Sequence, residues 1–523
     1  MNSRLESLAH LLGRRADANH DPRATFLELH VEQRFQLAER LFEDRVFHAA
    51  KRVGHSIEGR GHSRTPLKRR FRPVKVGKLQ LPLPPGYPAA VPFRERRWAL
   101  PLTIFVFFAA VYCVTAGPRL VSPSPNNHFV HLADAWLHGR LDLGPGAPGT
   151  NDWACFDTLE RGSCPPGRYS FSGTEAERYR WYVSFPPLPA VLLLPFVALF
   201  GLGTWDALFW VVLAGVAPAL LFVVLRTLRD SGQSQRSERD DLLLTALFAV
   251  GSVYYFVAVQ GSVWFAAHVA ASVFICVYLW GALGARRPAI AGLALGLAFL
   301  CRPATLMLAP LYAFEAFGAS RRNERSLAAS SLAFALPLAL AVLAAMGHNA
   351  IRFGDPFEFG HSFLQIKWRS RIETWGLFSA HYLPRNLSVF FLSLPWWLGQ
   401  SPFVRISRHG LALWFTTPNL LWGLFPKKVD LTIVGLWVAV LCTASCTLLY
   451  QNTGWVQFGY RFSLDYLPLL FVLVALSGRR FNAAFLACVA FSVVLNTFGA
   501  VTFDRHHQFY DTDTTQSVIF QPE

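Results

Sequence analysis

The chain has 523 residues, of which 53% are hydrophobic and only 16% charged, and its mean hydropathy is positive. This balance is too apolar for an ordinary soluble protein of the same length. The formal charge of +16 does not indicate a nucleic-acid-binding protein, because the basic residues lie in an N-terminal leader and in short clusters between apolar runs.

Residues 1–97 form a basic leader with twenty Lys and Arg against ten Asp and Glu. The leader lacks the apolar core that a signal peptide needs, so we expect it to stay in the cytoplasm. Its first half could form an amphipathic helix, and the stretch HSRTPLKRRFRPVKVGK could lie against anionic lipid. A basic tail that is merely solvated explains the composition equally well.

Apolar runs of roughly 17 to 25 residues, long enough for a helix to cross the hydrocarbon core, recur from residue 98 onward. They predict an all-α, polytopic helical membrane protein of about 10 to 12 spans. We expect residues 98–500 to form one membrane-embedded domain, followed by a tail at 501–523.

Five basic segments separate the later apolar runs, and the positive-inside rule places all five in the cytoplasm. They are 226–241, 285–288, 320–325, 426–428 and 478–480. One crossing per span from residue 205 onward satisfies the rule and leaves VQGSVW, LCRP, the large loop 347–408, QNTGWVQFGY and the tail outside. The first span, which starts from the cytoplasmic leader, places the loop 117–182 on the same external side. We therefore expect a multi-pass protein of the cell (cytoplasmic) membrane with a cytoplasmic N-terminus and an external active face.

The apolar run VSFPPLPAVLLLPFVALFG, residues 183–201, would reverse this count if it crossed the membrane once. It contains four prolines, which remove helix donors and kink the helix axis. We expect it to be re-entrant or to lie in the membrane plane. The alternative is that segment 226–241 is external and that the charge rule fails there.

The stretch NNHFVHLADAWLHGRLDL, residues 126–143, predicts an in-plane amphipathic helix in the first external loop. At 100° per residue, one arc of about 120° holds five ionisable side chains. These are His128, His131, Asp134, His138 and Asp142. Interfacial helices usually carry Lys and Arg on the wet face, so this His and Asp face favours proton transfer, although a purely interfacial helix is the alternative. A divalent cation on His131, Asp134 and His138 is a lesser alternative, because the spacing matches no standard zinc signature.

Other ionisable side chains collect on the same predicted external side, where they are expensive unless they line a cavity or a site. They are His268, Arg302, Arg352, Asp355, Arg461 and Asp465, together with Tyr460. Arginine offers a fixed fork of donors for phosphate, whereas snorkelling to the interface is the alternative for each lone arginine. For His268 alone, a hydrogen-bonded bundle histidine is the simpler interpretation. Taken together, the set indicates a site for an anionic lipid-linked substrate.

Cys155 and Cys164 are the pair of cysteines in a polar loop. A disulfide between them fits an oxidising compartment, and two buried thiols fit the sequence as well.

The order of these motifs resembles that of the C-type (GT-C) integral-membrane glycosyltransferases, including the protein mannosyltransferase-like bacterial members. The matching motifs are HFVHLADAWLHGRLDL, WYVSFPPLPAVLLLPF, LCRPATLMLAPLYAFE, NAIRFGDPFEFGH and GYRFSLDYLPLL, within roughly residues 98–500. The resemblance implies transfer of a sugar from a polyprenyl-phosphate donor to a glycan, lipid or protein acceptor on the non-cytoplasmic face. It implies no certain cofactor, with a divalent cation as a possibility, and no nucleic-acid partner.

In this family a carboxylate of the first external loop acts as the base. That role would pass to Asp134, with His128 or His131 assisting. Many members carry an acidic pair at the start of the loop, where this chain has Asn126 and Asn127, so the base has moved or catalysis has been lost. The substrate-binding candidates are Arg302, Arg461 and Arg352 for the carrier phosphate, with Tyr460, His268 and His138.

Two other functions are compatible with the sequence. A transporter or flippase of lipid-linked saccharides would show inverted repeats and ionisable groups near mid-membrane, whereas this chain shows no such repeat and its titratable groups lie at one end of the spans. A catalytically degenerate membrane homologue would explain the missing acidic pair.

Overall fold

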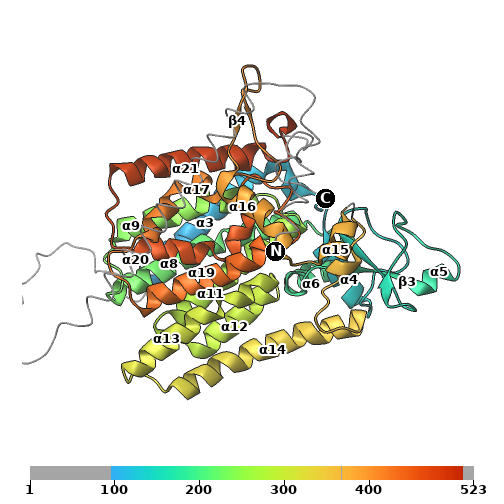
Figure 1. Ribbon diagram of the computed structural model, residues 1–523, viewed down its shortest axis with the longest axis horizontal. Coiled ribbons are helices and arrows are strands. Elements are labelled where there is room, and N and C mark those ends of the chain that lie inside the picture. The colour runs from blue at the N-terminus through green and yellow to red at the C-terminus, as the bar shows by residue number, and fades with distance from the viewer. Residues whose placement is uncertain (1–95, 367, 511–523) are drawn as a thin grey trace, which may run out of the picture. The chain divides into compact units, whose positions relative to one another are not determined.

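The computed structural model describes residues 96–366 and 368–510, so the predicted leader helix and most of the predicted tail lie outside the described residues. Helices dominate the described part, and six of them are long and apolar enough to cross a membrane (Figure 1). They are α3 (Arg96–Ala116), α7 (Asp206–Ala214) continued by α8 (Val216–Asp230), α11 (Val263–Ala282), α14 (Leu327–Phe353), α19 (Leu431–Leu448) and α21 (Ala483–Thr502). The prediction of an all-α polytopic membrane protein is confirmed.

Shorter and broken helices pack between the long ones. They are α6 (Leu188–Phe200), α9 (Glu238–Val250), α10 (Tyr254–Ala258), α12 (Pro288–Phe299), α13 (Ala309–Arg321), α16 (Leu383–Leu392), α17 (Leu413–Thr416), α18 (Leu421–Leu424) and α20 (Leu467–Leu476). Because several of them are too short to cross a bilayer alone, the number of spans stays a prediction.

A proline explains where α12 ends, and a glycine explains how closely α12 and α14 pack. The backbone of Arg302 is extended because Pro303 follows it, which ends α12 and starts the 3-10 helix η4 (Pro303–Leu308). Where α12 and α14 pack together, a Cβ added to Gly292 would lie 1.9 Å from the carbonyl oxygen of Phe334. Such close helix contact through small residues is typical of membrane bundles.

The first loop folds into a small sheet over the helix α4 (His128–Leu137). Its strands are β1 (Trp153–Asp157), β2 (Gly162–Ser163) and β3 (Tyr179–Val183), in the antiparallel order β2-β1-β3, with α5 (Glu175–Arg178) before β3. Cys155 pairs with Trp181 in the β1 and β3 register. The disulfide that the sequence left open is present between Cys155 and Cys164.

The helix α14 continues to Phe353 and ends at Gly354 in the left-handed conformation, so the first residues of the predicted loop 347–408 are helical. The loop contains α15 (Arg369–Trp375) and a hairpin of β4 (Trp396–Trp397) and β5 (Val404–Arg405).

The five basic segments gather at one end of the helices. Arg236 donates hydrogen bonds to the carbonyl oxygens of Val474, Ala475 and Arg479, which joins segment 226–241 to the end of α20. Lys427 donates its backbone N–H to the carbonyl oxygen of Ser477 at 2.9 Å. These bonds hold three of the five segments together.

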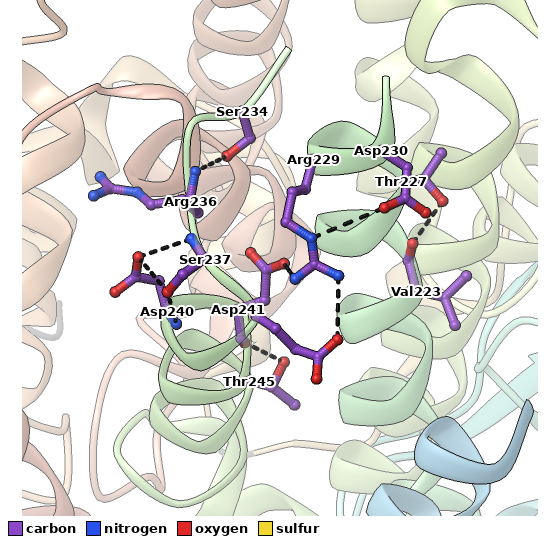
Figure 2. Close-up of polar contacts among 11 residues, drawn as sticks. Val223, Thr227, Arg229, Asp230, Ser234, Arg236, Ser237, Asp240, Asp241 and Thr245 are labelled. Atoms are coloured by element: carbon purple, nitrogen blue, oxygen red, sulfur yellow. Dashed lines mark hydrogen bonds and ion pairs between the residues drawn. The ribbon is translucent and has the colours of Figure 1, made fainter. Parts of the chain in front are cut away.

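Two further contacts add the other two segments to the same end. Arg325 donates to the carbonyl oxygen of Arg286 at 2.9 Å, and Arg286 in turn lies close to Thr227 of segment 226–241. In segment 226–241, Ser237 starts α9 with a capping box closed by Asp240, and Arg229 pairs with the buried Asp241 at 2.6 Å (Figure 2). The grouping is the one that the charge rule predicts.

Both ends of α6 are tied to the first loop. Val183, just before α6, belongs to β3, and the hydroxyl and backbone N–H of Ser124 each donate to the carboxylate of Asp206, which begins α7. In between, α6 packs along α4. These contacts hold α6 against the first loop, and the re-entrant or in-plane course of 183–201 stays a prediction.

Candidate functional site

A buried ion pair forms the base of the site. Arg302, at the break between α12 and η4, donates Nε to Oδ1 of Asp465 at 3.0 Å and Nη2 to Oδ2 at 2.9 Å. Asp465 ends the 3-10 helix η8 (Arg461–Asp465) and is fully buried. Nδ1 of His268, from α11, lies 3.3 Å from Oδ1 of the same carboxylate. Asp465 therefore fixes the guanidinium of Arg302 against α11.

Arg461 brings a second guanidinium to the same place, one turn of η8 before Asp465. The guanidinium carbons of Arg302 and Arg461 lie 5.3 Å and 5.6 Å from the ring centroid of Phe462. Nη1 of Arg461 donates to the carbonyl oxygen of Val456 at 2.9 Å. Within the described part of the chain, Arg302 has a carboxylate partner, whereas Arg461 has no ion pair.

The first loop supplies a carboxylate that the sequence interpretation missed. Asp152 lies just before β1 with a left-handed φ of 58°, and its Oδ2 accepts a hydrogen bond of 2.7 Å from Nε1 of Trp264 in α11. Burial raises the pKa of Asp152, while the Trp264 hydrogen bond and the charge of Arg461 act in the opposite direction. Arg461 lies on the same part of α11, because its guanidinium carbon is 5.1 Å from the ring centroid of Phe265, the residue after Trp264.

The prediction for His128 needs a correction. Helix periodicity predicts a wet polar face for it, but its side chain is fully buried and its ring stacks on Trp153 with centroids 3.7 Å apart. Burial lowers the pKa of His128 to about 3, so the ring is neutral and its Nε2–H donates to the carbonyl oxygen of Asn151 at 2.9 Å. The misplacement arises because Trp153, from the later strand β1, covers this face of α4. His128 supports the turn that holds Asp152.

The other members of the predicted arc lie further along α4. Asp134 is half-buried, with Oδ2 lying 3.6 Å from Nδ1 of the exposed His138. The ring of His131 lies edge-on to Trp153 at 5.6 Å, and burial lowers its pKa. Asp142 is outside the helix, contrary to expectation, because α4 ends at Leu137 and Gly139 is left-handed.

Among residues 96–366 and 368–510, no three His, Cys, Asp or Glu side chains form a metal-binding group, so the cation alternative gains no support.

Two predicted substrate-binding residues are occupied by contacts within the protein. Arg352 donates to the carbonyl oxygen of Val183 at 2.7 Å and to Oδ1 of Asn349 at 2.9 Å, which ties α14 to β3. The fully buried Tyr460 packs edge-on against Phe390, with ring centroids 5.1 Å apart.

The arrangement offers defined chemistry. A loop carboxylate with a raised pKa can accept a proton, and the guanidinium of Arg461 can stabilise a phosphate. Sequence periodicity drew attention to α4, whereas Asp152 lies in a turn that has no periodic pattern; its position in the loop of the disulfide pair was the one available signal.

Comparison with known proteins gives distant structural likeness. No family model and no curated protein matches the chain. The oligosaccharyltransferase of Archaeoglobus fulgidus, solved in the apo form, aligns with 78% of this chain and 56% of its own at 13% identity and a TM-score of 0.43. The same protein, tethered to an acceptor peptide containing the NVT sequon, aligns at 13% identity and a TM-score of 0.40. The chain spans little more than half the length of that protein, and at this similarity the assignment of function depends on the site itself.

Proposed function

We propose that this protein is a membrane glycosyltransferase that moves a sugar from a polyprenyl-phosphate-linked donor to an acceptor on the non-cytoplasmic face. One observation carries the proposal: Trp264 holds the first-loop carboxylate of Asp152 by a hydrogen bond, and the guanidinium of Arg461 lies over the ring of the next residue, Phe265. A proton acceptor beside cations is what glycosyl transfer from a lipid phosphate requires.

Arg461 is the proposed contact for the donor phosphate. Its charge has no carboxylate partner in the described residues, whereas two donors of Arg302 are taken by Asp465. When the bond between the anomeric carbon and the phosphate oxygen breaks, the electron pair stays on the phosphate. A guanidinium already in place stabilises this charge without reorganisation.

Asp152 is the proposed base. It would accept the proton of the acceptor group as the acceptor's nucleophilic atom bonds to the anomeric carbon, so that the leaving phosphate and the protonated carboxyl balance the charges. The raised pKa supports this role because a base works best when its pKa approaches the working pH. Asp134 contacts His138 instead, so Asp152 is the better candidate by geometry.

The position of the site supports an external active face. Trp264 and His268 lie in the first turns of α11, and the opposite end of that helix is followed by the basic segment 285–288. Because basic segments are retained in the cytoplasm, the site would face the other side.

The test is sugar transfer by membranes that contain the full chain, using a radiolabelled polyprenyl-phosphate sugar. We expect Asp152→Asn to lower the rate by about 100-fold or more, the usual effect of losing a general base. The matched control, Asp134→Asn, removes a carboxylate from the same loop and is expected to leave the rate close to that of wild type. Loss of transfer in the control alone would identify Asp134 as the base. Full activity of both variants would refute a loop carboxylate as base.

A further inference from the structure

A groove of about 450 Å³ lies between the first turns of α12 and α14, at the end where the basic segments gather. Figure 1 shows α14 running beside α12, with which it packs extensively. Arg287, Arg325 and Ser326 form its polar lining, and Ile290, Ala329 and Ala333 its apolar lining. The residues that line the groove include no carboxylate.

The two arginines of the groove have few partners among the described residues. The guanidinium carbon of Arg287 lies 3.8 Å from the ring centroid of Trp280, and its Nη1 has no hydrogen-bond partner among the described residues. Arg325 donates one hydrogen bond, from Nη2 to the carbonyl oxygen of Arg286. Neither arginine takes part in an ion pair within the part of the chain that the structure describes. The first turns of two helices, whose dipoles favour anions, add to this positive potential.

The apolar lining continues into a surface that suits acyl chains. Leu332, Leu336 and Leu340 follow along α14 and are 68%, 59% and 60% exposed. In a membrane-spanning helix such side chains face lipid. The groove thus joins a cationic end to a lipid-facing wall.

We propose that this groove binds the phosphate headgroup of an anionic phospholipid from the leaflet at the basic end, with its acyl chains along α14. Basic pockets between membrane helices on the cytoplasmic side recognise such headgroups. The leader of this chain is an unsuitable occupant because its twenty basic residues outnumber its ten acidic ones, so the arginines would repel it. The site is independent of the proposed sugar transfer.

The test measures lipid bound to the purified full chain. Delipidated protein in detergent is incubated with equal amounts of phosphatidylglycerol and phosphatidylcholine, and native mass spectrometry counts the bound molecules. We expect wild type to retain phosphatidylglycerol in preference to phosphatidylcholine. The double variant Arg287→Gln, Arg325→Gln should lose about tenfold or more in affinity for the first bound phosphatidylglycerol.

Two further variants separate the groove from general charge. Lys428→Gln, Arg480→Gln removes two exposed cations from the same end and should retain the lipid. Ala329→Trp fills the groove, keeps both arginines and should lose the lipid, and it decides the matter if the arginine variant does not fold. Unchanged phosphatidylglycerol binding in Ala329→Trp, or an equal loss in the Lys428 and Arg480 variant, would overturn the proposal.

Discussion

Arg302 and Asp465 are 163 residues apart in the chain and form a two-bond ion pair at the base of the candidate site. The carboxylate is fully buried, and the arginine side chain is 23% exposed. A buried pair of this kind is costly to break from one side, because the remaining charge loses its partner inside the protein.

We therefore expect Asp465→Asn to lower the free energy of unfolding by about 3 kcal/mol or more. The double variant Arg302→Gln, Asp465→Asn should cost less than the sum of the two single substitutions, because it leaves no unpaired charge. Chemical denaturation in mixed micelles gives the three values. Additive effects would mean that the two residues do not stabilise one another.

The loss of Arg461 should weaken binding of the donor. Arg461 carries the charge without a carboxylate partner in the described residues, so Arg461→Gln is expected to weaken binding of the polyprenyl-phosphate donor by about tenfold or more, the value of a hydrogen bond to a charged group. Equilibrium binding of the labelled donor lipid to the purified chain measures this.

A matched control for that experiment is Arg352→Gln. The guanidinium of Arg352 is held by the carbonyl oxygen of Val183 and by Asn349, so its loss should reduce stability and leave donor affinity unchanged. If Arg352→Gln weakened donor binding while Arg461→Gln did not, the phosphate would have to be placed at α14.

The buried His128 should make the folded protein sensitive to acid. Its pKa is about 3 in the folded state, below the ordinary value of 6.5, so the unfolded chain binds the extra proton between these two pH values. The contribution of His128 to stability is complete above pH 6.5 and is lost progressively as the pH falls toward 3.

The expected result is that His128→Gln narrows the difference between the unfolding midpoints at pH 7.5 and pH 4.5, measured in detergent. His138→Gln serves as the control because that side chain is 64% exposed. A pH difference in His128→Gln as large as in wild type would show that this ring does not titrate between the two states.

Features that depend on neighbouring residues in the sequence could be predicted, whereas contacts between distant parts of the chain could not. Hydropathy and charge are local properties, so they predicted the membrane class and the basic segments that Arg236 and Arg325 now join. The ion pair of Arg302 could not be predicted, because nothing in the sequence near residue 302 indicates Asp465. The helix pattern misled at His128, since Trp153 from a strand outside the helix covers that face. Asp152 was missed because its importance comes from Trp264 and Arg461, both more than 100 residues away.

The predicted orientation of the chain places the two ends of the helix bundle on opposite sides of the membrane, which cysteine labelling can test. A cysteine introduced at Leu159, which is 74% exposed in the first loop, should react with a membrane-impermeant maleimide in intact cells. A cysteine at the exposed Ser231, in segment 226–241, should react only after the cells are permeabilised. The parent chain gives the background, because its free cysteines are buried or half-buried in the bundle. Labelling of Ser231→Cys in intact cells would place the basic end outside. The proposed donor site would then face the cytoplasm, and the lipid groove would have to draw its phosphate from the outer leaflet.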